Sequence, residues 1–157
     1  PVTSEYDVPL MPTGGYTSET FAYGAVNNLR CTGKELVVYA LYDFDRSGQD
    51  AANSLREKVE RFGAEFDVPV SFHQLGLTHE QVTGLDLPTR PAKRSSAADQ
   101  RWPYPFAAEL DAIPPDTIRD FVREAIERHL PAHELEHLKY VEAQERELLL
   151  RFIGSAA

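Results

Sequence analysis

A run of apolar residues that ends in two aspartates constrains this chain more than any other feature. Residues 36–42 (LVVYALY) are almost all aliphatic or aromatic, and the sequence Asp43-Phe44-Asp45 follows directly. Such a run predicts a β-strand that is covered on both faces of a parallel sheet. Sites in open α/β sheets form beyond the carboxyl ends of the strands, so the two carboxylates stand where such folds keep their chemistry.

The segments around this strand alternate between the periods of strands and helices. Short loops between such segments favour an α/β fold, a Rossmann-like and mostly parallel sheet flanked by helices. In chain order we expect a strand, a helix, the strand at 36–42, a helix and a strand, with the four flanking elements at 6–11, 19–30, 50–62 and 68–75.

The second half of the chain has a different character. Residues 87–105 hold four prolines and no periodicity, which predicts a long loop of the kind that is usually functional or mobile. Two helices are expected beyond it, one from Pro114 and one over 131–152, separated at Leu130-Pro131. The domains are therefore predicted as an α/β domain over 1–113 and a helical extension over 114–157.

Charge and composition limit the partners of the chain. Its 157 residues carry a net charge of −9, which opposes non-specific attraction to nucleic acid, so any such binding must be local. The loop at 87–105 has the opposite sign, because only Asp99 offsets its basic residues. We expect nucleic acid, most readily DNA, to contact the basic side chains of Arg46, Arg90, Lys93, Arg94 and Arg101.

The compartment is predicted from two negative features. No apolar run approaches the roughly 20 residues of a membrane helix. The single cysteine, Cys31, cannot form an internal disulfide, which favours a reducing compartment. We therefore expect a cytoplasmic protein.

The aspartate pair predicts a magnesium site. Asp43 and Asp45 can converge on one divalent cation where the chain turns, and Gly48 would allow a tight turn before the next helix. Alternatively, both aspartates only end the strand while Ser47 or Asp50 caps the helix. An EF-hand is disfavoured because its twelfth position would be Ser54, and a dehalogenase-type phosphatase because Ser47 replaces the usual threonine.

A rival motif lies near the C-terminus. His133-Glu134-Leu135-Glu136-His137 matches His-Glu-x-x-His on a predicted helix, where the two imidazoles could bind zinc and Glu134 could act as general base. A Glu-rich helix meets this pattern easily by chance. A solvated helix is the simpler interpretation.

Three segments in a fixed order carry a resemblance to a known family. The segment YALYDFDRSGQDAA, preceded by VPLMPTGGYTS and followed by AAELDAIPP, resembles the TOPRIM domain of the type IIB topoisomerase A subunit and its relatives, over about residues 1–120. The resemblance implies that Asp43 and Asp45 hold Mg²⁺ beside a scissile phosphate and are the catalytic residues. Gly15 would lie in the Gly-Tyr turn of that family.

The sequence also departs from the family pattern. The first TOPRIM strand and the Glu at its end are missing, because VPLMPTGGY already matches the second strand, and Arg46 stands where relatives often have proline. The resemblance thus implies part of a larger chain, with Mg²⁺-dependent cleavage or transesterification of phosphodiesters. A homodimer is the alternative to a larger parent chain. The open alternative is a non-catalytic DNA-binding or assembly module whose final helix mediates dimerisation.

Overall fold

The computed structural model describes residues 2–155, apart from the side chains of residues 132–135, 137–139 and 152–155. Two compact units divide the chain: residues 9–118 form one, and residues 2–8 together with the chain from Arg119 onward form the other. The first unit is mixed α/β and the second is helical. The predicted boundary after residue 113 lies close to this division, but the N-terminal residues group with the helices.

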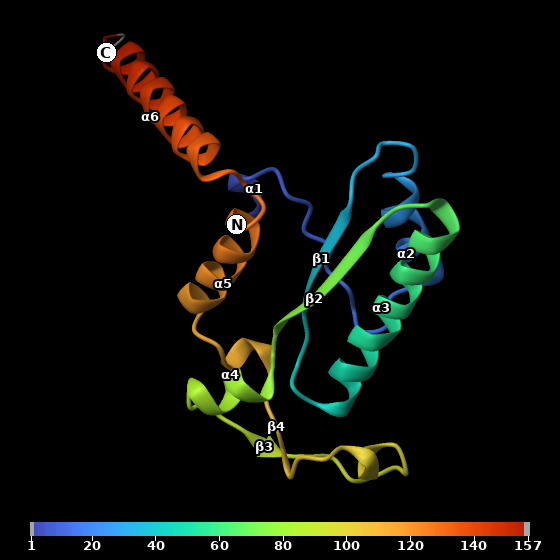
Figure 1. The fold of residues 1–157 in the computed structure, drawn as a ribbon. Coiled ribbons are helices and arrows are strands. Elements are labelled where there is room, and N and C mark those ends of the chain that lie inside the picture. Colours follow the sequence, from blue (N-terminus) through green and yellow to red (C-terminus); the bar gives the residue numbers. More distant parts are fainter. Residues whose placement is uncertain (1, 156–157) are drawn as a thin grey trace. The chain divides into compact units, whose positions relative to one another are not determined.

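A parallel pair of strands forms the centre of the α/β unit (Figure 1). Strand β1 (Leu36–Leu41) is followed by helix α3 (Arg46–Phe66) and strand β2 (Val70–Gly76), and β1 pairs with β2 from Leu36 opposite Val70 to Ala40 opposite Gln74. The predicted parallel β-α-β arrangement is confirmed for these three elements.

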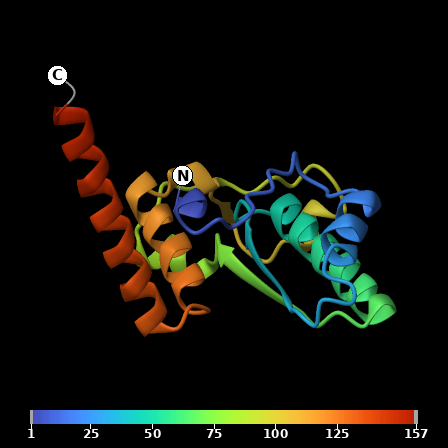
Figure 2. The ribbon, with the colours of Figure 1, turned by 90° about the horizontal axis from the view of Figure 1, so that it is seen from above.

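Helix α2 (Glu19–Asn27) and helix α3 pack together beside one face of this sheet (Figures 1 and 2). Their apolar stripes form a buried cluster with Val68, which precedes β2, and burial of such surface contributes about 25 cal/mol per Å². The predicted coverage of β1 on both faces is not seen within this unit, since Ala40 is its only fully buried residue. The cluster consists of Ala22, Val26, Leu55, Val59 and Val68.

The strand predicted over residues 6–11 is absent, and this prediction was wrong. Residues 8–13 have no regular structure, and Asp7 takes a left-handed conformation with φ 53°. Pro9 and Pro12 have no backbone N–H to donate to a neighbouring strand, which explains why an apolar segment stays outside the sheet. The parallel sheet of this unit therefore has two strands rather than the predicted three.

Short elements occupy the predicted loop at 87–105 and the residues on either side of it. Helix α4 (His79–Gly84), which the sequence analysis missed, begins with a capping box between Thr78 and Gln81. The chain then forms strand β3 (Arg90–Pro91), a 3₁₀ turn (Asp99–Arg101), strand β4 (Phe106–Ala107) and a second 3₁₀ turn (Leu110–Ala112). Strands β3 and β4 pair antiparallel, so both ends of this long connection are fixed together.

Helices make up the other unit. It contains α1 (Val2–Glu5), the larger part of α5 (Pro115–Glu127) and α6 (Ala132–Ser155), so the two predicted C-terminal helices are confirmed. The Tyr6 hydroxyl donates a hydrogen bond to the Glu127 carboxylate at 2.6 Å, which ties the N-terminal residues to α5. None of the helices in the described residues combines the length and apolarity that crossing a membrane requires.

Candidate functional site

The segment Asp43-Phe44-Asp45, called the acidic turn below, lies between β1 and α3. Asp45 is the N-cap of α3, and its Oδ1 accepts a hydrogen bond from the backbone N–H of Gly48 at 2.8 Å. A Cβ atom at Gly48 would stand 2.3 Å from the carbonyl oxygen of Asp43, so only glycine fits this close approach of the helix to the strand end. The helix starts at Arg46 rather than at the predicted Asp50, because Asp45 caps it.

An arginine neutralises the second oxygen of Asp45. The guanidinium of Arg90, on strand β3, donates to Asp45 Oδ2 at 3.0 Å and to Glu109 Oε1 at 3.2 Å. Both carboxylate oxygens of Asp45 therefore have protein donors. The side chain of Asp45 is only 16% exposed, whereas that of Glu109 is 54% exposed, so the Asp45 end of this bridge is the better shielded from water.

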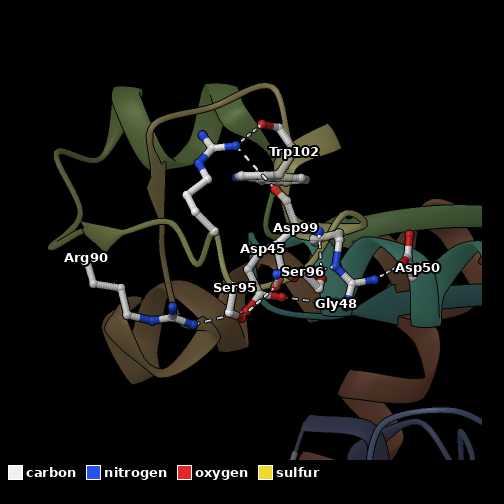
Figure 3. A network of polar contacts seen from close by, with 10 residues as sticks. Asp45, Gly48, Asp50, Arg90, Ser95, Ser96, Asp99 and Trp102 are labelled. Carbon is white, nitrogen blue, oxygen red and sulfur yellow. Dashed lines mark hydrogen bonds and ion pairs between the residues drawn. The ribbon is translucent and has the colours of Figure 1, made fainter.

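Asp99 is the hub of the neighbouring network (Figure 3). Its Oδ1 accepts from Arg46 Nε at 2.8 Å, and its Oδ2 accepts from the Ser95 hydroxyl at 2.9 Å and from the Ser96 N–H at 3.0 Å. The Arg46 guanidinium, with the help of Ser96 and Ser95, holds the pKa of Asp99 well below its usual range. The hydrogen bond to Asp99 in turn raises the pKa of Arg46, which also pairs with Asp50.

The basic residues predicted to bind nucleic acid divide into two groups. Arg46 and Arg90 are engaged in ion pairs, and Arg94 donates to the backbone carbonyls of Asp99, Trp102 and Tyr104 at 3.2, 2.8 and 2.7 Å. These three arginines hold the 87–105 segment in place. Lys93 and Arg101 are exposed, and they are the members of the predicted set best placed to meet a partner.

Aromatic rings fix the same segment to the strand end. Phe44, between the two aspartates, is 4% exposed and lies with its ring centroid 5.0 Å from those of Trp102 and Tyr104. The indole N–H of Trp102 donates to the carbonyl of Phe106 at 3.0 Å. These rings pack into the protein, where the edge-to-face contact of Phe44 with Trp102 and the tilted contact with Tyr104 stabilise the turn.

Asp43 lies on a more open side of the turn. It is exposed, and its Oδ1 accepts one hydrogen bond, from the backbone N–H of Leu110 at 2.8 Å. No described residue donates to its Oδ2. Asp43 lines a wide cavity of about 460 Å³ with two further carboxylates, and the full lining is Asp43, Glu109, Leu110, Asp111 and Ile118.

The described residues contain no ready-made cluster of three or more His, Cys, Asp or Glu side chains that could hold a metal ion. Carboxylate oxygens are nevertheless what Mg²⁺ prefers, and it is usually held by one or two of them together with waters and substrate phosphates. Asp43 offers such an oxygen, and Asp45 offers one when Arg90 is withdrawn. The predicted turn residue Gly15 takes φ 104°, a conformation that favours glycine.

Sequence reasoning did not single out Asp99. A signal was present, because Ser96 and Asp99 are spaced as in a capping box, and each accepts a hydrogen bond from the backbone N–H of the other. Asp99 was counted only as an offset to the basic charge of the loop.

The His-Glu-x-x-His motif lies on α6, as expected. The side chains of His133, Glu134 and His137 lie outside the described residues, so the zinc hypothesis stays a prediction.

Comparison of the chain with protein-family models, with curated proteins and with solved structures gave no match. The TOPRIM resemblance therefore stays a prediction that rests on the three sequence segments.

Proposed function

We propose that the acidic turn binds Mg²⁺ and serves phosphodiester cleavage or transesterification on nucleic acid. The observation that carries the proposal is the position of Asp43, an exposed carboxylate at the carboxyl end of a parallel strand, with one oxygen to which no described residue donates and a cavity beside it. This is the edge at which open α/β sheets hold their ligands.

The residues of the site would have separate roles in binding the cation and the phosphate. Asp43 would hold the cation through Oδ2, because its Oδ1 is oriented by the Leu110 N–H. Asp45 would join it with the oxygen that Arg90 now occupies. A bound Mg²⁺ would polarise the phosphate and stabilise the leaving oxygen. Lys93, which lines a small cavity with Arg46 and Arg90, would meet the phosphate backbone.

Calorimetric titration of Mg²⁺ into the wild-type protein and Asp43→Asn tests this proposal. Binding should occur in the wild type and be lost in the variant, which keeps the shape of the side chain but removes its charge. Asp86→Asn is the matched control, because Asp86 is exposed and its left-handed conformation, φ 49°, suits asparagine. Wild-type protein that does not bind Mg²⁺, or binding that Asp43→Asn leaves unchanged, contradicts the proposal.

Activity is tested separately on supercoiled plasmid DNA. Mg²⁺-dependent nicking or DNA binding that disappears in Asp43→Asn and persists in Asp86→Asn supports the catalytic role. If Mg²⁺ binds at Asp43 but DNA binding does not depend on it, the site holds a cation without acting on nucleic acid.

A non-catalytic assembly module is the second candidate, and helix α6 favours it. All the side chains described from Tyr140 to Arg151 are exposed, and Leu148, Leu149 and Leu150 are 53, 63 and 63% exposed. Most of the stability of a helix in proteins comes from packing of one of its faces, so a partner along α6 would stabilise it. Light scattering of the wild type and Leu149→Glu tests this candidate, which predicts a dimer that the added charge disrupts.

A further inference from the structure

Arg90 provides the positive charge that Asp45 of the acidic turn shares with Glu109. Its guanidinium bridges Asp45 Oδ2 and Glu109 Oε1. An arginine stays protonated at every accessible pH, so this charge cannot be removed by titration. A divalent cation that binds Asp45 through Oδ2 must therefore either displace the guanidinium or bind against its repulsion.

The position of Arg90 allows such displacement. Its backbone is held in β3, where Arg90 pairs with Ala107 of β4, while its side chain is 33% exposed and ends at the surface carboxylate of Glu109. Arg46 differs, because its guanidinium is held by Asp50 and by Asp99, which is 8% exposed. Of these two arginines, Arg90 is the one whose release leaves the helix start and the Asp99 hub intact.

We propose that Arg90 is an internal counter-cation that competes with the divalent cation for Asp45. This inference rests on the proposed function, since it assumes the cation site at the turn, and it assigns Arg90 a positioning role that lowers cation affinity until the guanidinium moves away. In the metal-free protein Arg90 keeps Asp45 neutralised. When Mg²⁺ binds, the guanidinium leaves Asp45 and becomes available to an oxyanion such as a phosphate.

The test is a Mg²⁺ titration of the wild type, Arg90→Gln and Lys34→Gln by calorimetry. Lys34→Gln removes one positive charge at an exposed position before the opposite end of β1, so it controls for net charge. Arg90→Gln should bind Mg²⁺ about tenfold more tightly than the wild type, because a like charge next to the site is removed. Lys34→Gln should bind with nearly wild-type affinity.

A second measurement follows the wild-type protein itself, and a variant serves only to assign its signal. The Nε–H of Arg90 gives a nitrogen-proton NMR signal, assigned by its absence in Arg90→Lys, and Mg²⁺ should shift this signal as the guanidinium leaves Asp45. Mg²⁺ binding that leaves the signal unmoved, or equal affinity in the wild type and Arg90→Gln, overturns the inference alone. Absence of Mg²⁺ binding in all three proteins overturns both this inference and the proposed function.

Discussion

The acidic turn has two sides that the sequence motif does not distinguish. On the closed side, which comprises Asp45, Arg46, Arg90 and Asp99, each acidic side chain is paired with an arginine. On the open side, which comprises Asp43, Glu109 and Asp111, the carboxylates line a cavity, and Asp43 makes one hydrogen bond to the backbone. Two aspartates two residues apart thus have different environments.

The difference teaches what each side can do. Paired charges with saturated hydrogen bonds stabilise the fold, because removing one partner without a replacement charge leaves the other desolvated and unpaired. An exposed carboxylate whose second oxygen has no protein donor contributes little to stability, and this oxygen is available to a ligand. The closed side should therefore dominate stability, and the open side should dominate cation binding.

The largest loss of stability is expected from Gly48→Ala. The added Cβ would stand 2.3 Å from the Asp43 carbonyl oxygen, so the strand end and the helix start must separate, at a cost of about 3 kcal/mol. Urea denaturation measures this loss. Gly24→Ala is the matched control, because no atom lies within 4 Å of its Cβ position inside α2, and it should raise stability by about 0.5–1 kcal/mol. Equal behaviour of the two variants would show that the turn is not tightly packed.

A smaller loss, with a distinct pH dependence, is expected from Asp99→Asn. The folded-state pKa of Asp99 is lowered by Arg46, so its stabilising contribution is complete above the unfolded pKa of about 3.9 and is lost as pH falls below it. The urea midpoint of Asp99→Asn should lie below that of the wild type at pH 7, and the gap should narrow below pH 4. A gap that stays constant down to pH 3 would contradict the role of the Asp99 charge.

The elements with clear local signals were predictable from the sequence. The apolar run of β1 and the amphipathic period of α3 correctly predicted a strand and a helix, because the side chains that make these patterns also form the core or pack against it. The ends of α3 were harder to predict. The helix predicted over 50–62 continues through Gly63 to Phe66, and Asp67 takes the left-handed C-cap position. A Cβ at Gly63 would stand 2.6 Å from the Val70 side chain, so this glycine allows close packing on β2 and does not end the helix.

The candidate site was only half predictable. A motif identifies Asp43 and Asp45 as neighbours at a strand end. It carries no information about their hydrogen-bond partners, which are distant in the chain: Arg90 follows Asp45 by 45 positions, and Leu110 follows Asp43 by 67. Arg90 and Leu110 reach the turn only through the tertiary fold. Arg94 was predicted from its charge to meet phosphate, whereas its geometry matches three backbone carbonyls.

Asp45→Ala and Asp45→Asn distinguish the contribution of the helix cap from that of the ion pair to Arg90. Alanine removes the N-cap of α3 as well as the ion pair to Arg90, and we expect a loss of about 1–2 kcal/mol. Asparagine can still accept from the Gly48 N–H, so it should lose less than half as much. Thermal denaturation of both variants measures the difference. Equal losses would mean that the ion pair, rather than the cap, stabilises the turn.

The smallest loss of stability is expected from Asp43→Ala. Asp43 is exposed and gives up one hydrogen bond to the Leu110 N–H, which corresponds to about 0.5–1 kcal/mol. The wild type should melt at a higher temperature with Mg²⁺ than without it, and the same variant should abolish this rise, since a ligand stabilises only the state that binds it. Calorimetric scans with and without Mg²⁺ measure both effects. A loss as large as that of Asp45→Ala would place Asp43 among the structural residues of the closed side, and the division of the turn into two sides would then fail.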